Sequence, residues 1–131
     1  ETLNGCNTGD AKITRGYRLA AKHVIHTVGP IWRGGHRREA EHLASCYRRS
    51  IELAAQHKLT SISFPAISCG VYRFPLDQAA EIALRTVDEA LESAPSMQRV
   101  RFVLFDQAAY DAFREAWNRL AQGETRERHV G

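Results

Sequence analysis

Small residues and one aromatic side chain make up the segment Ser68-Cys69-Gly70-Val71-Tyr72, a composition typical of turns that bind phosphate. The segment follows the apolar run Ser61–Phe64, which indicates a short buried strand, and it precedes Pro75, which is favoured in the first turn of a helix. A strand that leads through such a turn into a helix presents backbone N–H groups and a helix N-terminus to an anion. We expect Gly70 to adopt a positive φ and to let a ligand approach the backbone closely. A turn that uses its glycine only for packing is the alternative.

No other group of residues forms a catalytic arrangement that can be recognised from its spacing. The serines lack the context of a nucleophile elbow, and Asp77 and Asp106 are placed to act as helix-end charges. Cys69 lies at a glycine turn before a helix, where the pKa of a thiol can be lowered, but a small packing residue is the favoured interpretation. The sequence therefore assigns no catalytic residue. It also indicates no metal site, because no Cys and His spacing fits one, and these residues require no cofactor.

The elements that must position this turn alternate along the chain. Strands are expected at Lys12–Thr14, Lys22–Val28, Ser61–Phe64 and Arg99–Phe105. Helices are expected for about twenty residues after the loop Trp32–His36, from Leu76 to Leu91, and after Asp106, which is placed to cap the last one. Strands that alternate with helices predict an α/β fold, a three-layer α/β/α sandwich with a mixed, mostly parallel sheet and helices on both faces.

The third helix and the end of the chain set the expected domain limits. Tyr110, Phe113, Trp117 and Leu120 recur at helical spacing and are expected to form one stripe packed in the core. From Gly123 the chain is polar and is expected to be frayed. We therefore expect a single domain over residues 1–122 and a polar tail over residues 123–131.

The composition excludes several classes of protein. Of the 131 residues, 44% are hydrophobic and 25% are charged, with a formal net charge of +3, which is typical of a globular chain. No run is long and apolar enough for a membrane span. The three cysteines show no disulfide pattern, so free thiols and a cytoplasmic location are expected. Arginines cluster at 33, 37 and 38 and at 48 and 49, where a solvated helix face is favoured over an RNA-binding surface.

Two features are expected to meet at one edge of the sheet. In open α/β sheets, ligands bind beyond the carboxyl ends of the strands. The turn that contains Gly70 and the ring of Phe105 both follow expected strands. A flat ring at that edge can stack on a nucleic base, which is worth about 1–3 kcal/mol. Turn and ring together predict a site for a nucleoside diphosphate.

Several ordered motifs carry a resemblance to a known family. They are Gly9–Thr14, Gly16–Leu19, Ala21–Pro30, Phe64–Tyr72 and Phe74-Pro75. From about Asn4 to Leu120 the chain strongly resembles the macrodomain family, and it is most similar to the branch of bacterial and mitochondrial ADP-ribosyl hydrolases. The resemblance implies a fold that binds ADP-ribose. By position it implies that Ser68, Cys69, Gly70, Val71 and Tyr72 wrap the diphosphate and distal ribose, that Phe105 stacks on adenine and that Phe74 shapes the pocket wall.

The resemblance also implies segments that are not found here. Macrodomains of this branch begin with a strand and turn that read the adenine, and with turns that hold an asparagine and an aspartate credited with catalysis. The chain starts at Glu1, near the end of that region. We expect a fragment of a longer protein whose N-terminal strands are missing. A naturally shortened macrodomain, or one completed by another chain, is the alternative.

Three functions follow as hypotheses. The first is hydrolysis of ADP-ribosyl esters, on mono-ADP-ribosylated acidic side chains or on O-acetyl-ADP-ribose, if the natural protein contains the missing segment. The second is a non-catalytic module that binds ADP-ribose or an ADP-ribosylated protein. RNA binding through the basic clusters is a third and weaker hypothesis. The oligomeric state is left open.

Overall fold

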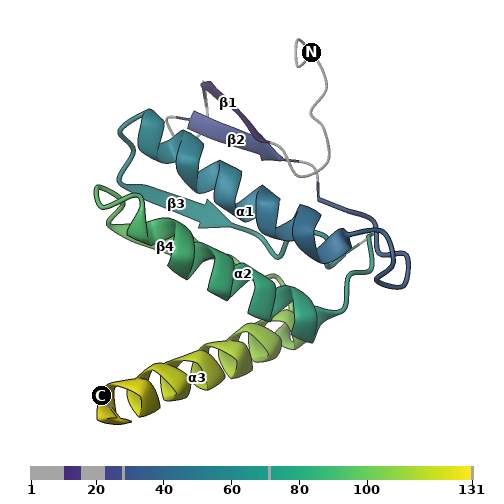
Figure 1. The fold of residues 1–131 in the computed structure, drawn as a ribbon. Coiled ribbons are helices and arrows are strands. Elements are labelled where there is room, and N and C mark those ends of the chain that lie inside the picture. Colours follow the sequence, from purple (N-terminus) through teal and green to yellow (C-terminus); the bar gives the residue numbers. More distant parts are fainter. Residues whose placement is uncertain (1–10, 16–22, 28, 71, 131) are drawn as a thin grey trace.

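The computed structural model describes residues 11–15, 23–27, 29–70 and 72–130. Its elements, in chain order, are β1 (Ala11–Arg15), β2 (His23–Thr27), α1 (Glu39–Gln56), β3 (Ser61–Phe64), α2 (Leu76–Glu92), β4 (Arg99–Phe102) and α3 (Gln107–Val130) (Figure 1). Every expected strand and helix is present in the expected order. Strand β4 ends at Phe102, earlier than the predicted end at Phe105.

The four described strands form two ladders. Strands β1 and β2 pair antiparallel, with Ala11 opposite Thr27. Strands β3 and β4 pair parallel, with Ser61 opposite Arg99 and Phe64 opposite Phe102. The sequence predicts one mixed, mostly parallel sheet, whereas the described strands form two separate ladders, one antiparallel and one parallel.

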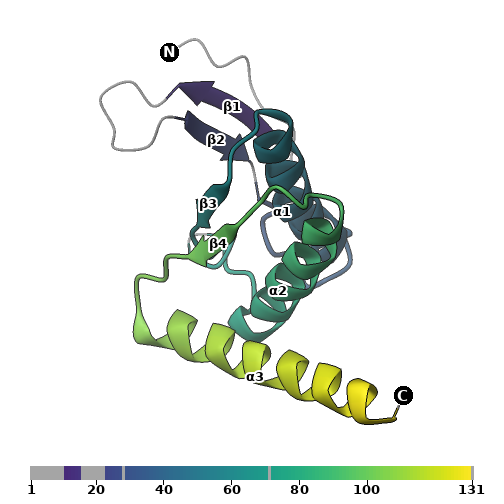
Figure 2. The ribbon, with the colours of Figure 1, turned by 90° about the vertical axis from the view of Figure 1, so that its left-hand side faces the viewer.

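Helices α1 and α2 lie on one face of the β3–β4 ladder, and α3 runs past its β4 side (Figure 2). The side chains of β3 and β4 alternate between the face that the helices cover and the exposed face. Ile62, Phe64, Val100 and Phe102 are buried or half-buried, whereas Ser61, Ser63, Arg99 and Arg101 are exposed. Among the described residues no helix covers the second face of this ladder. The α/β class is confirmed, and the described part shows two layers where the sequence predicts three.

Aromatic rings join the layers of the core. The ring centroid of Tyr47 on α1 lies 4.9 Å from that of Phe64, and Phe102 lies 5.8 Å from Phe64. Phe113 on α3 continues the row, 5.2 Å from Phe102. Ring pairs at such distances add to the stability gained from burial. The row therefore connects the carboxyl ends of β3 and β4 rigidly to α1 and α3.

Helix α3 confirms one expectation and corrects another. Its start is capped as predicted, because the Asp106 carboxylate accepts the Ala109 N–H at 2.8 Å. The buried stripe comprises Ala109, Phe113 and Ala116, whereas Tyr110 and Trp117 are 51% and 63% exposed. These two aromatics lie about a quarter turn from the centre of the buried stripe, so the expectation that they pack in the core was wrong.

The last helix also continues through residues 123–130, which the sequence analysis expects to be frayed. The domain boundary at residue 122 stays a prediction.

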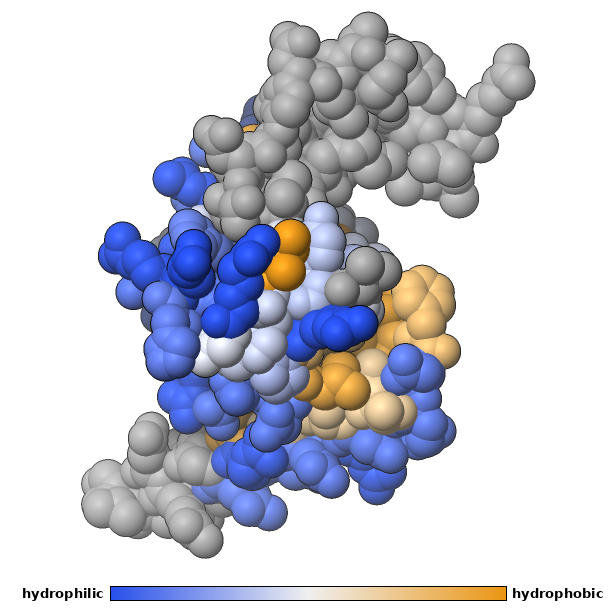
Figure 3. Space-filling model, turned by 90° about the vertical axis from the view of Figure 1, so that its right-hand side faces the viewer, coloured by the Kyte–Doolittle hydropathy of each residue, from blue (hydrophilic) through white to orange (hydrophobic). Residues whose placement is uncertain are grey.

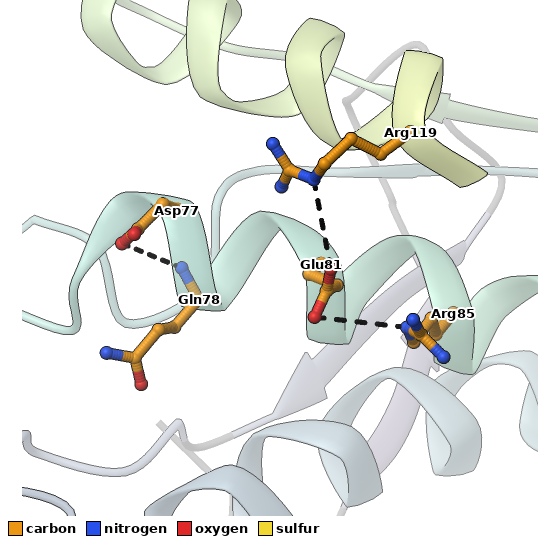
Figure 4. A network of polar contacts seen from close by, with 5 residues as sticks. All are labelled: Asp77, Gln78, Glu81, Arg85 and Arg119. Carbon is orange, nitrogen blue, oxygen red and sulfur yellow. Dashed lines mark hydrogen bonds and ion pairs between the residues drawn. The ribbon is translucent and has the colours of Figure 1, made fainter. Parts of the chain in front are cut away.

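The ion pairs of Glu81 on the outside of α2 and α3 are long and exposed (Figure 4). Glu81 contacts Arg85 at 3.9 Å on its own helix and Arg119 of α3 at 4.0 Å. Asp77 lies in the first turn of α2, as expected of a helix-end charge. None of the described helices is long and apolar enough to span a membrane.

Candidate ADP-ribose-binding site

The segments that follow β3 and β4 leave the ladder at the same edge. The two strands run parallel, and the Val103 N–H donates to the Phe64 carbonyl at 2.7 Å, which extends their pairing by one step. The loop 65–75 and the segment 103–106 therefore begin side by side. Viewed from the end toward which β3 runs, the surface shows an apolar area bordered by hydrophilic residues (Figure 3).

Short hydrogen bonds close the loop 65–75 on itself. The Phe74 N–H donates to the Ser68 carbonyl at 2.9 Å, and the Arg73 N–H donates to the Gly70 carbonyl at 3.0 Å. A buried phenol holds its first half from below, because the Ile67 N–H donates to the Tyr47 hydroxyl at 3.2 Å. Burial raises the pKa of the Tyr47 phenol, which therefore stays neutral and keeps its hydroxyl for these contacts. The fold thus presents the loop in one preformed shape.

The backbone bends at Ser68 and Arg73, with φ of 67° and 59°, and Gly70 has no positive φ. The expectation that Gly70 supplies a left-handed bend was wrong. The two flanking residues take up the bend, and the Phe74–Ser68 hydrogen bond holds them in this less favourable region. Gly70 matters for a different reason. A Cβ placed on it would meet no atom of the described residues within 4 Å, so its backbone faces open space in the described part of the chain.

Ser68 points away from that open space and into the protein. Its Oγ is buried and has no hydrogen-bond partner among the described residues. Gly29 lies directly behind it, because a Cβ on Gly29 would overlap Ser68 Oγ and come within 2.6 Å of Ile67 Cγ2. Gly29 therefore lies against the back of the loop.

Cys69 does not have the environment of a nucleophile. Burial, and then the nearby Asp106 carboxylate, raise the pKa of its thiol to about 11. The suggestion that the turn lowers this pKa was wrong, because the thiol is half-buried and its strongest charged neighbour is negative. The favoured interpretation, a small packing residue, fits the Sγ contact with the Ile67 carbonyl at 3.5 Å.

The aromatic residues assigned to the site differ in exposure. Phe105 is 86% exposed at the end of the segment that follows β4, and Tyr72 is 37% exposed on the loop. Phe74 is only 2% exposed, and its ring packs 4.9 Å from that of Trp32. Phe74 therefore supports the loop from behind and does not itself present a pocket wall. Val71 lies outside the described residues.

Trp32, in the turn between β2 and α1, and Glu39, the first residue of α1, were not predicted to belong to the site. The Trp32 N–H donates to the Tyr72 carbonyl at 2.9 Å. The signal that could have found them is the pair Gly34-Gly35 after a tryptophan, followed by a carboxylate in the first turn of a helix.

Other parts of the described surface have fewer features of a ligand site than the loop 65–75. A groove of about 660 Å³ lies between α1 and α2, and it is lined by Arg38, Ala40, Glu41, His42, Ala44, Arg48, Ile82, Arg85, Thr86 and Glu89. It takes no residue from the loop 65–75 and mixes both signs of charge. Within the described ranges no three His, Cys, Asp or Glu side chains are grouped to hold a metal ion.

Comparison with known sequences identifies the family. The model of the Macro domain family matches residues 1–83, which is more than half of the chain. The chain is 52% identical over 121 residues to a macro domain-containing protein of Mesorhizobium japonicum, covering 92% of this chain and 69% of that protein. It is 48% identical to one from Methanosarcina mazei, covering 92% and 64%. The chain belongs to the macrodomain family.

Solved structures agree with this assignment. The Oceanobacillus iheyensis macrodomain with ADP superposes with a TM-score of 0.83 at 42% identity, covering 89% of this chain and 61% of that one. A mutant of the same macrodomain was solved with ADPR. The Trypanosoma brucei macrodomain in complex with ADP-ribose has a TM-score of 0.78 at 37% identity, covering 87% and 47%. The chain thus spans about two thirds of the length of its curated relatives, and less of these solved chains.

Proposed function

We propose that this protein binds ADP-ribose at the edge where β3 and β4 end. The observation that carries the proposal is the pairing of a preformed loop, open at Gly70, with the largely exposed ring of Phe105 on the adjacent segment. An exposed phenylalanine next to open backbone is suited to stacking on a purine while the loop holds a diphosphate. The ADP and ADP-ribose complexes of similar macrodomains support the choice of ligand.

We further propose that the complete protein hydrolyses ADP-ribosyl esters. Water would attack at C1″ of the distal ribose, or at the acetyl ester of O-acetyl-ADP-ribose, and the acid would leave from the ADP-ribose. The loop would contribute by holding the diphosphate, which fixes the ribose relative to the water. The described residues supply this positioning, and we assign no general base to them. The raised pKa of Cys69 argues against a thiolate nucleophile.

A module that binds ADP-ribose without turning it over is the second candidate. It is favoured by the same observation that limits the first, since the described loop contains positioning groups and no activated nucleophile. RNA binding has less support, because Arg38 and Arg49 of the basic clusters pair with Glu41 and Glu52 on their own helix.

Calorimetric titration of the full-length protein with ADP-ribose tests the binding proposal. Phe105→Ala is the test variant, and Trp117→Ala, which removes another exposed aromatic on α3, is its matched control. We expect weaker binding only in the first variant. No heat of binding with the wild-type protein would contradict the proposal.

Incubation with a mono-ADP-ribosylated acidic protein then separates the two candidates. Release of labelled ADP-ribose supports the hydrolase, and binding without release supports the non-catalytic module. A parallel titration with RNA over a range of salt concentrations covers the third hypothesis.

A further inference from the structure

We infer that the turn 32–39 positions the second half of the ligand loop, with Trp32 as the contact and Glu39 as the clamp that holds Trp32 in place. This inference rests on the proposed function, because it assigns a role to residues outside the loop in binding the same ligand. Neither residue touches the open side of the loop, so both act through Tyr72 and Phe74.

The Glu39 carboxylate organises the turn. It is 1% exposed and accepts three backbone N–H groups, from Arg33 at 2.8 Å, Gly35 at 3.0 Å and Arg37 at 2.6 Å. Burial by itself raises the pKa of this carboxyl, but the hydrogen bonds from the backbone outweigh it and lower the pKa to about 2. The group is therefore an ionised buried clamp at neutral pH, placed where a helix N-terminus favours negative charge.

Trp32 connects the turn to the loop. Its backbone N–H donates to the Tyr72 carbonyl at 2.9 Å, and the centroid of its indole ring lies 4.9 Å from that of Phe74. The ring also lies against Gly35, where an added Cβ would come within 3.2 Å of it. Two of the backbone N–H groups that Glu39 binds belong to Arg33, the residue after Trp32, and to Gly35, which the Trp32 ring contacts.

The loop is thus anchored at both ends by residues distant in sequence. Tyr47 holds the first half through Ile67, and Trp32 holds the second half through Tyr72. Fixing a binding loop before the ligand arrives lowers the entropy lost on binding. Releasing one anchor should therefore lower the affinity for the ligand even where the core of the protein stays folded.

Two pairs of matched variants test the inference in the full-length protein. Glu39→Gln removes the buried charge, and Glu41→Gln removes a carboxylate from the same helical turn that is exposed and pairs only with Arg38. Gly35→Ala pushes on the Trp32 ring. Its control is Gly34→Ala, where φ is 86° against 88° at Gly35 and the added Cβ would lie 3.6 Å from its nearest neighbour, His36. Both alanines carry the same backbone strain, so a difference between the two variants in loop exchange or in Kd reports the displacement of the Trp32 ring.

Hydrogen exchange of the loop amides 66–74 and calorimetry with ADP-ribose are the readouts. We expect Glu39→Gln and Gly35→Ala to speed loop exchange and to raise Kd by about tenfold, while their controls match the wild type in Kd to within about twofold. Exchange of the α2 amides should not change, which distinguishes release of the loop from global unfolding. Should Glu39→Gln unfold the protein, the glycine pair decides alone.

Equal exchange and equal Kd within each pair would overturn the inference. The exchange measurement needs no ligand, so it separates this inference from the proposed function. If the wild-type protein binds no ADP-ribose but Glu39→Gln still loosens the loop, the coupling stands and the proposed ligand fails. If the wild type binds and the loop is unaffected by either variant, the ligand stands and the coupling fails.

Discussion

The loop 65–75 and the outer surfaces of α2 and α3 are both rich in polar contacts, and they differ in what those contacts can do. On the loop, the backbone hydrogen bonds at Phe74 and Arg73, of 2.9 and 3.0 Å, and the buried hydrogen bond from Ile67 to Tyr47 fix one shape. On the helices, Glu81 reaches its two arginines at 3.9 and 4.0 Å between side chains that are 44 to 61% exposed. Water competes for the ion pairs on the helices, whereas the hydrogen bond that anchors the loop to Tyr47 is buried. We therefore expect substitutions in the loop to change ligand binding and stability, and substitutions on the outer surfaces of α2 and α3 to change them very little.

The largest expected effect is that of Gly70→Val on ligand binding. A branched side chain would fill the open space in front of the loop, and we expect a loss of at least about 2.7 kcal/mol, roughly a hundredfold in Kd. Because a Cβ there meets no protein atom and φ is not positive, the melting temperature should match the wild type. Calorimetry and thermal denaturation measure the two quantities. Unchanged affinity would remove the loop from the site.

Gly29→Ala should act in the opposite way, on the fold first. The added methyl overlaps Ser68 and Ile67 behind the loop, and overpacking of this kind costs about 1–3 kcal/mol. Denaturant unfolding measures the loss. A variant as stable as the wild type would show that the loop moves aside easily, and it would contradict the rigid loop described above.

Phe105→Ala tests the exposed ring without touching the core. We expect binding of ADP-ribose to weaken by about 1–3 kcal/mol, as for removal of a stacking partner, and binding of ribose 5-phosphate to stay the same. The residue is 86% exposed, so the free energy of unfolding should change little. Equal losses for both ligands would mean that the ring does not stack on the base.

Glu81→Gln is the smallest expected effect and the counterpart to the loop variants. It removes the two ion pairs of Glu81, one with Arg85 on the same helix and one with Arg119 on α3. Exposed pairs of this geometry contribute about 0–0.5 kcal/mol, so denaturant unfolding should barely register the change. A loss above about 1 kcal/mol would erase the contrast between the two regions.

Much of the fold could be predicted because its signals are local. The alternation of residues in Ser61–Phe64, the Pro75 start of α2 and the Asp106 cap of α3 each depend on neighbours within a few positions. The stripe on α3 was misjudged at Tyr110 and Trp117, because helical spacing shows which residues share a face and not which neighbour covers that face.

The candidate site shows the same division. The turn at Gly70 and the ring at Phe105 were predicted from the sequence, since strand ends predict which residues reach one edge of a sheet. The buried phenol beneath the loop and the clamp at Glu39 were not found. Tyr47 and Ile67 are distant in sequence, and nothing local in either segment indicates that they meet.

By itself, the sequence determined the order of strands and helices, the place of the candidate ligand loop and membership of the macrodomain family, because periodicity, turn residues and ordered motifs are properties of short segments. Only the tertiary structure decided that Ser68 and Arg73, and not Gly70, take the left-handed bend. It also decided that the pKa of the Cys69 thiol rises and that Trp32 holds the loop. These properties depend on burial and on contacts between distant segments, which come into existence only when the chain folds.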